Sequence, residues 1–69
     1  MAVRQFHLYG TTRAGVSLDL GYRAGTKSDV SRALSYDRKR HDLVIGEAWE
    51  VHTTPDSVGE RREVLKEWK

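Results

Sequence analysis

Hydrophobic and polar residues alternate along two stretches near the start of the chain, and this alternation predicts two β-strands. In residues 14–22 the even positions are apolar or aromatic, whereas the odd positions are small or charged. The apolar face of this stretch consists of Ala14, Val16, Leu18, Leu20 and Tyr22. Residues 4–10 alternate in a similar way, with Phe6 and Leu8 on one face and Gln5, His7 and Tyr9 on the other. A hairpin of these two strands therefore requires a loop of three or five residues, with a bulge at Gly10 or Gly15.

A third strand is predicted for residues 43–53. Its apolar face consists of the odd positions Leu43, Ile45, Trp49 and Val51. Glu47 interrupts this face. Trp49 and Trp68 are expected in the core, where they would fill the space between a sheet and a helix.

The C-terminal residues carry the signals of a helix that ends at Trp68. Thr54, Pro55 and Asp56 combine a capping hydroxyl, a proline suited to the first helical position and an acid for the first turn. The apolar stripe of this helix would consist of Val58, Val64, Leu65 and Trp68. Arg61 falls inside the same stripe. Because an unpaired buried charge is costly, we expect either that Arg61 meets Glu47 at the margin of the core or that a bulge at Gly46 turns Glu47 to solvent.

The segment before the third strand supports two interpretations. Ser28 can cap a short helix within residues 28–40. The inner face of that helix would consist of Val30, Ala33 and Leu34. The apolar stripe fails after Leu34, however, because Asp37 occupies the next expected position. If the apolar residues instead follow the two-residue repeat of a β-strand, the same segment forms a β-hairpin with a charged tip. The pattern slightly favours this hairpin.

Both interpretations give the α+β fold class. We expect a small antiparallel β-sheet of three or four strands with a C-terminal α-helix packed on one face, and the helix within 28–40 as an optional second one. All 69 residues should form a single domain, because a chain this short cannot support two. Folding of such a chain buries only about 60% of the surface that its unfolded form exposes. With no Cys and 38% hydrophobic residues, the core must form alone or across a homodimer.

The net charge of +2 conceals an asymmetry. Residues 1–41 hold eight Lys/Arg and three Asp/Glu (+5), whereas residues 42–69 hold four and seven (−3). Such an asymmetry can steer a charged partner and permits head-to-tail self-contact. Arginine outnumbers lysine eight to four, which indicates a GC-rich bacterial or phage genome. Neither a signal-peptide pattern nor an apolar run of about 20 residues is present, so we expect a cytoplasmic protein without a membrane partner.

The densest run of positive charge is the first candidate binding site. It consists of Arg38, Lys39, Arg40 and His41. The basic residues that could extend it are Arg23, Lys27 and Arg32. Clustered basic groups neutralise phosphates and release counterions. Turns also carry charge simply because they are solvated, and this simpler interpretation is favoured, since the chain lacks the large positive excess of a typical DNA-binding domain.

Residues for catalysis, metal binding or cofactor binding are not arranged in a recognisable motif. The serines lack a GxSxG context, and the glycine-containing stretches lack the GKS or GKT ending that holds nucleotide phosphates. Glu50 and His52 share a strand face that His7 could approach, but no complete ligand spacing is present. The sequence therefore predicts a protein that is not an enzyme and needs no metal or cofactor.

His7 and Tyr9 are the second candidate site. They stand on the face of the first strand opposite Phe6, where the neighbouring strand contributes only small or acidic residues. A tyrosine beside small side chains makes a shallow recess that suits a partner's side chain or a stacked base. An ordinary solvent-exposed sheet face would carry the same residues.

The leading functional hypothesis is a small non-enzymatic binding protein that acts on a protein partner as a regulator or inhibitor. It depends on the missing catalytic, metal and nucleotide motifs and on the charge asymmetry. The alternative is a nucleic-acid-binding module that uses residues 38–41 and the neighbouring basic groups.

Overall fold

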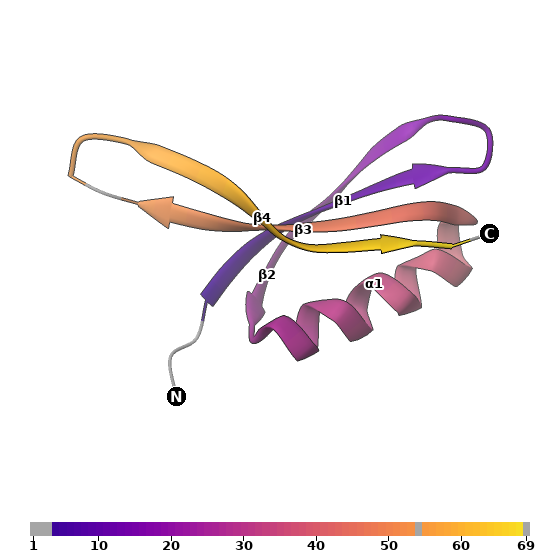
Figure 1. Cartoon of the computed structure of the whole chain (residues 1–69), viewed down its shortest axis with the longest axis horizontal. Coiled ribbons are helices and arrows are strands. Elements are labelled where there is room, and N and C mark those ends of the chain that lie inside the picture. Colours follow the sequence, from indigo (N-terminus) through magenta and orange to yellow (C-terminus); the bar gives the residue numbers. More distant parts are fainter. Residues whose placement is uncertain (1–3, 54, 69) are drawn as a thin grey trace.

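The computed structural model describes residues 4–53 and 55–68, which form one four-stranded sheet and one helix (Figure 1). The elements in chain order are β1 (Arg4–Thr12), β2 (Ser17–Gly25), α1 (Lys27–His41), β3 (Leu43–Thr53) and β4 (Val58–Glu67). The strands lie in the order β2-β1-β3-β4, and each neighbouring pair is antiparallel. The helix connects the edge strand β2 to β3 and lies against one face of the sheet (Figure 1).

The expected C-terminal helix is wrong, because those residues form strand β4. Their apolar side chains could share a helical stripe, but in the strand they separate. Val64 pairs with Ala48 and packs against the core, whereas the next residue, Leu65, pairs with Glu47 and points to the other side. Strand β4 also hydrogen-bonds the outer edge of β3, which a helix could not do.

The preference for a hairpin in the middle of the chain is also wrong, because α1 is the helix of the described residues. It begins at the N-cap Thr26 and not at Ser28. The Thr26 hydroxyl accepts from the Asp29 N–H at 3.3 Å, and the Asp29 carboxylate accepts from the Thr26 N–H at 2.9 Å. This capping box satisfies two backbone donors. Asp42, in the left-handed conformation, ends the helix. The cap expected at Thr54 lies outside the described residues.

The core between α1 and the sheet is small. Its buried side chains are Phe6 and Leu8 of β1, Val30, Ala33 and Leu34 of α1, and Leu43 and Ala48 of β3. The three helical members are those expected for the inner face of a helix. Full burial of a side chain such as Phe6 or Leu34 stabilises the fold by about 1.5 to 3 kcal/mol. Among the described residues, no helix has the length and apolar content needed to cross a bilayer.

The loop of the β1–β2 hairpin has an odd number of residues, as expected for two strands whose apolar side chains both lie at even positions. The Thr12 N–H donates to the Val16 carbonyl at 2.9 Å, which leaves residues 13–15 as the loop. Gly15 closes this loop with φ +85°, the conformation that a bulge at the end of such a turn needs. The predicted loop length is confirmed.

A further bulge in β2, which the alternation does not reveal, changes the face of Tyr22. The register shifts opposite Leu8 and Tyr9, so that Leu20 is an extra residue. After this bulge the even-numbered residues of β2 point to the opposite side of the sheet. Tyr22 therefore pairs with His7 on the side away from α1. The prediction that Tyr22 shares a face with Leu20 is therefore wrong.

Strand β3 has the predicted bounds, but a different side of it faces the core. Gly46 and Ala48 are buried towards α1, and Trp49 lies half-buried on the other side. The expectation that Trp49 fills the core is wrong. Trp68 does pack against the core, and its ring lies so close to Gly46 that a Cβ added there would be 2.7 Å from Cη2.

Gly46→Ala should therefore destabilise the protein. The new methyl group would overlap the Trp68 ring, and overpacking of this kind costs about 1 to 3 kcal/mol. Gly59→Ala is the matched control, because a Cβ at that strand position meets no atom within 4 Å. Urea unfolding of both variants measures the difference. Equal stability of the two variants would contradict the placement of Trp68 over Gly46.

Candidate functional site

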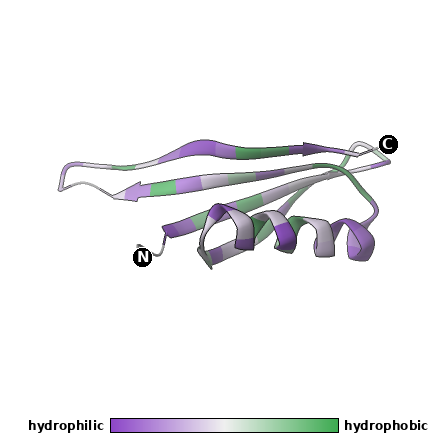
Figure 2. Ribbon diagram, turned by 60° about the horizontal axis from the view of Figure 1, so that its bottom comes forward, coloured by the Kyte–Doolittle hydropathy of each residue, from purple (hydrophilic) through white to green (hydrophobic). Residues whose placement is uncertain are grey.

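The sheet face turned away from α1, called the open face below, is covered by no element of residues 4–53 and 55–68 (Figure 2). Paired residues of neighbouring strands point to the same side, so the strand register defines its members. They include His7 and Tyr9 of β1, Asp19 and Tyr22 of β2, Glu47 and Trp49 of β3, and Glu60, Arg62, Leu65 and Glu67 of β4. Three of the six aromatic residues of the chain lie here.

His7 lies in the middle of the open face and is only 7% exposed, although no helix covers it. Its ring lies between two tyrosines, with centroid distances of 4.2 Å to Tyr9 and 4.3 Å to Tyr22. The rings are tilted by 31° and 30°. Ring contacts of this kind stabilise beyond the area they bury. The two tyrosines thus shield His7 from water.

Both ring nitrogens of His7 have a carboxylate partner. Nε2 lies 2.8 Å from Asp19 Oδ1, and Nδ1 lies 3.0 Å from Glu60 Oε2. The Tyr9 hydroxyl lies 2.8 Å from the same Nδ1 and donates to Glu60 Oε1 at 2.9 Å. Ionised carboxylates can only accept, so this arrangement favours a ring that donates from both nitrogens, which is the imidazolium form. Neither nitrogen is free to take a proton from a bound molecule, and the network has the geometry of a structural support.

The pKa shifts agree with this charge state. Burial lowers the pKa of His7, but the hydrogen bonds and charges of Glu60 and Asp19 outweigh burial and raise it above the ordinary 6.5. The Gly21 N–H, followed by the His7 ring, lowers the pKa of Asp19. The His7 and Tyr9 hydrogen bonds lower the pKa of Glu60. Burial, together with Glu60, raises the pKa of Tyr9 to about 12.

Beside this network the open face has a hollow of about 300 Å³. The Tyr9 and Trp49 rings meet edge to face in it, with centroids 6.3 Å apart and planes at 86°. The remaining lining residues are Gly10, Thr11, Ser17, Glu47 and Glu60. The volume is at the lower limit of ligand pockets, so the hollow suits one side chain better than a cofactor. Tyr9 lines this hollow, and His7 supports it through Glu60.

Glu47 at the rim of the hollow pairs with Arg62, not with Arg61 as expected. Arg62 Nη1 lies 3.2 Å from Glu47 Oε1. Arg61 pairs with Glu50 in the strand register, on the helix side, and forms an ion pair with Glu63 at 3.8 Å. The expectation failed because it placed Arg61 on a helix. Arg62 is half-exposed, so this surface pair contributes less than about 1 kcal/mol.

The open face is acidic and the helix side is basic. The charged members of the open face are Asp19, Glu47, Glu60, Glu67 and Arg62, which gives −3 before the charge of His7 is counted. Helix α1 holds five Lys/Arg and two Asp, which gives +3. The charge asymmetry along the sequence therefore becomes a separation between the two sides of the molecule.

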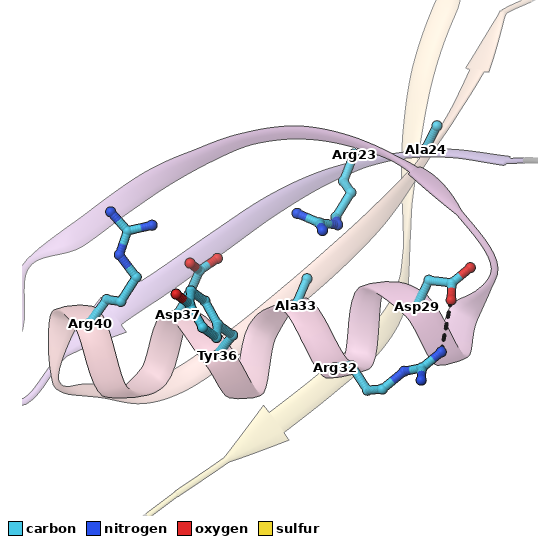
Figure 3. A pocket seen from close by; sticks show the side chains of 8 residues that line it. All are labelled: Arg23, Ala24, Asp29, Arg32, Ala33, Tyr36, Asp37 and Arg40. Carbon is cyan, nitrogen blue, oxygen red and sulfur yellow. Dashed lines mark hydrogen bonds and ion pairs between the residues drawn. The ribbon is translucent and has the colours of Figure 1, made fainter.

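Three of the predicted basic residues line a groove of about 550 Å³ between α1 and β2 (Figure 3). They are Arg23 of β2 and Arg32 and Arg40 of α1. Asp29 and Asp37 line the same groove, so its charged side chains sum to only +1. One Arg32 nitrogen is already 3.0 Å from Asp29 Oδ1. The groove brings together part of the predicted basic patch and also supplies its counter-charges.

The other predicted basic residues lie elsewhere. The Arg38 guanidinium is 5.4 Å from the centroid of the Trp68 ring, a cation–π contact at the margin of the core. Lys27 forms an ion pair with Glu63 at 3.1 Å. All four basic residues of the last helical turn are exposed: Arg38, Lys39, Arg40, which also lines the groove, and His41. The basic run is thus wound around the end of a helix, where positive charge is favourable, and is not gathered on a hairpin tip.

One group of potential metal ligands occurs within the described residues, with ligand atoms within 4.8 Å of one another. It consists of Glu50, His52 and Glu63. His7 does not join it, because its strand position faces the opposite side from Glu50. Arg4 lies 3.2 Å from Glu50 and Lys27 lies 3.1 Å from Glu63, so both carboxylates already have cationic partners. This group is an ion-pair cluster.

The sequence identified His7 and Tyr9 but missed the residues that surround them. The missed residues are Asp19, Tyr22, Glu47, Trp49 and Glu60. Of these, only Asp19 carried a usable signal, because its odd position in the alternating strand already placed it opposite the apolar face. The placement of the other four on the open face depends on strand register, including its bulges, and on strand β4, which the sequence did not reveal.

No protein-family model, no curated protein and no solved structure matches the chain. The function is therefore inferred from the geometry and chemistry of the two surfaces.

The pKa shifts predict that the His7 network stabilises the fold most between about pH 4.5 and pH 6.5. The raised pKa of His7 gives a contribution that is complete below 6.5 and is lost as the pH rises through the folded-state pKa. The lowered pKa values of Asp19 and Glu60 give contributions that are lost as the pH falls below 3.8 and 4.5. His7→Phe should therefore cost about 1 to 3 kcal/mol near pH 5.5 and less near pH 8.5.

Thermal unfolding at the two pH values measures this difference. His41→Phe is the control, because His41 is exposed at the end of α1, away from the network. An equal loss at both pH values in His7→Phe would contradict the imidazolium assignment.

Proposed function

We propose that the protein is a small non-enzymatic binding domain that holds a protein partner on its open face and thereby regulates or inhibits that partner. The proposal is supported above all by the aromatic content of an uncovered sheet surface. Tyr22 is 61% exposed and Leu65 is 44% exposed there, and the half-buried Trp49 lines the hollow. Tyrosine and tryptophan are enriched in protein interfaces and often dominate their binding energy.

The rigidity of the open face also supports a binding role. The Tyr9 hydroxyl is hydrogen-bonded to His7 and Glu60, and the Tyr22 ring packs against the His7 ring. Side chains that are already ordered lose little entropy on binding, so more of the contact energy appears as affinity.

The charge of the open face favours a protein over a nucleic acid as its partner. Its carboxylates would repel phosphates, although its aromatic rings could stack on bases. A protein surface that presents basic and apolar side chains would complement both features.

The arginine groove supports a second candidate function, nucleic-acid binding by the helix side. Three guanidinium groups from α1 and β2 line one groove, and Lys39 extends the basic surface of the helix. The two aspartates of the groove reduce its attraction for phosphates, which is why this function ranks second.

Affinity capture with paired variants distinguishes the two functions. We expect the immobilised protein to recover a protein partner from nuclease-treated lysate of its source cells. Tyr22→Ser/Leu65→Ser should abolish this recovery, because it removes the exposed apolar area of the open face. Arg32→Ala/Arg40→Ala should retain it. All four side chains are exposed, so both variants should remain folded, but Tyr22→Ser also removes a ring contact with His7. Circular dichroism of each variant therefore has to show a folded protein before the two recoveries are compared.

Recovery that requires nucleic acid and is lost in the arginine variant would instead favour the second function. A low-salt titration with duplex DNA provides an independent measurement, because affinity that falls steeply with salt indicates phosphate contacts.

A further inference from the structure

We propose that the hollow between Tyr9 and Trp49 receives the positively charged end of an arginine or lysine side chain of the protein partner. This inference deepens the proposed function and depends on it, since the hollow is part of the open face. It assigns a chemistry to the partner: a basic side chain that projects from its surface.

The shape of the hollow fits one long side chain. The planes of the two aromatic rings are almost perpendicular, at 86°, so together they form a corner. The volume of about 300 Å³ is too small for a second aromatic system the size of a nucleotide. Thr11 and Ser17 contribute small hydroxyl side chains to the lining.

The charges around the hollow select a cation. Glu47 and Glu60 both line it, and no lysine or arginine is among its lining residues. A cation over an aromatic face is attracted by the ring quadrupole, and a neighbouring carboxylate adds a charge-assisted hydrogen bond. An anion would meet two carboxylates, and an apolar group would leave them without a new partner.

Arg62 shows that a guanidinium already binds at the rim of this hollow. It is directly opposite Trp49 in the strand register, and its Nη1 is 3.2 Å from Glu47 Oε1. Because Arg62 is half-exposed, this pair is weak and can be displaced. A cation from a partner would therefore compete with Arg62 for Glu47.

Glu60 is less available than Glu47. Its two carboxylate oxygens accept from the His7 ring and from the Tyr9 hydroxyl, at 3.0 Å and 2.9 Å. It contributes negative potential to the hollow while holding the Tyr9 ring in place. Glu47 is therefore the carboxylate that should contact the bound cation.

The test is an NMR titration of the ¹⁵N-labelled protein with the peptide Gly-Gly-Arg-Gly-Gly, with acetylated and amidated ends. The control peptide carries citrulline, which has nearly the shape of arginine but no charge. We expect the arginine peptide to shift the Trp49 indole N–H and the Tyr9 and Glu47 amides. The citrulline peptide should bind about fivefold to tenfold more weakly. Added salt should weaken binding of the arginine peptide but not of the citrulline peptide.

Three variants complete the test. Glu47→Gln should weaken binding of the arginine peptide about fivefold, because it removes the contacting carboxylate. Glu67→Gln, on the same face but outside the hollow, should leave binding unchanged. Arg62→Gln should strengthen binding about threefold, because it removes the competing guanidinium.

Equal binding of the two peptides would overturn the proposal, and so would unchanged binding by Glu47→Gln. Peptide-induced shifts confined to α1 would do the same. The proposed function would survive each of these results if the partner is still captured and Tyr22→Ser/Leu65→Ser still abolishes capture. Conversely, arginine binding in the hollow without any captured partner would contradict the proposed function alone.

Discussion

The packing of α1 on one face of the sheet is the contact on which the rest of the structure depends. Phe6, Val30 and Leu34 have no exposed surface, and they join the helix to the central strands. The one helix found in residues 4–53 and 55–68 can cover only one side of the four-stranded sheet. The other side must therefore be stable while it remains in contact with water. This constraint explains why so much of the polar and aromatic chemistry of the molecule lies on the open face.

The His7 network acts in place of a second covering layer. His7 lies on the inner strand β1, Asp19 lies on the edge strand β2, and Glu60 lies on the opposite edge strand β4. A single imidazolium thus connects both edges of the sheet to its centre. Because its partners are charged, each of these hydrogen bonds is stronger than a neutral one. The network that stabilises the exposed side also holds Tyr9, one of the two aromatic residues that line the hollow.

The sequence predicted the parts of the fold that depend on local pattern. The bounds of β3 and the odd loop of the first hairpin are encoded in residue spacing. The inner face of α1 was also anticipated, but only under the less favoured of two interpretations of that segment. The sequence did not reveal β4, because its apolar residues also fit a helical stripe, and only pairing with β3 decides between the two. The bulge at Leu20 likewise depends on the partner strand, and it moved Tyr22 into the site. The candidate site was therefore only partly predictable: His7 and Tyr9 follow from one strand, whereas their partners follow from strand pairing.

The opposite charges of the open face and α1 can be sensed separately in solution. A helix with its side chains is about 10 to 12 Å across, and the sheet adds further distance between the two charged surfaces. At physiological ionic strength the Debye length is only about 8 Å. A molecule that approaches the open face therefore experiences the carboxylates there, with little influence from the arginines behind the sheet. In this way a domain with a small net charge can present two electrostatically independent surfaces, and each could engage a different molecule at the same time.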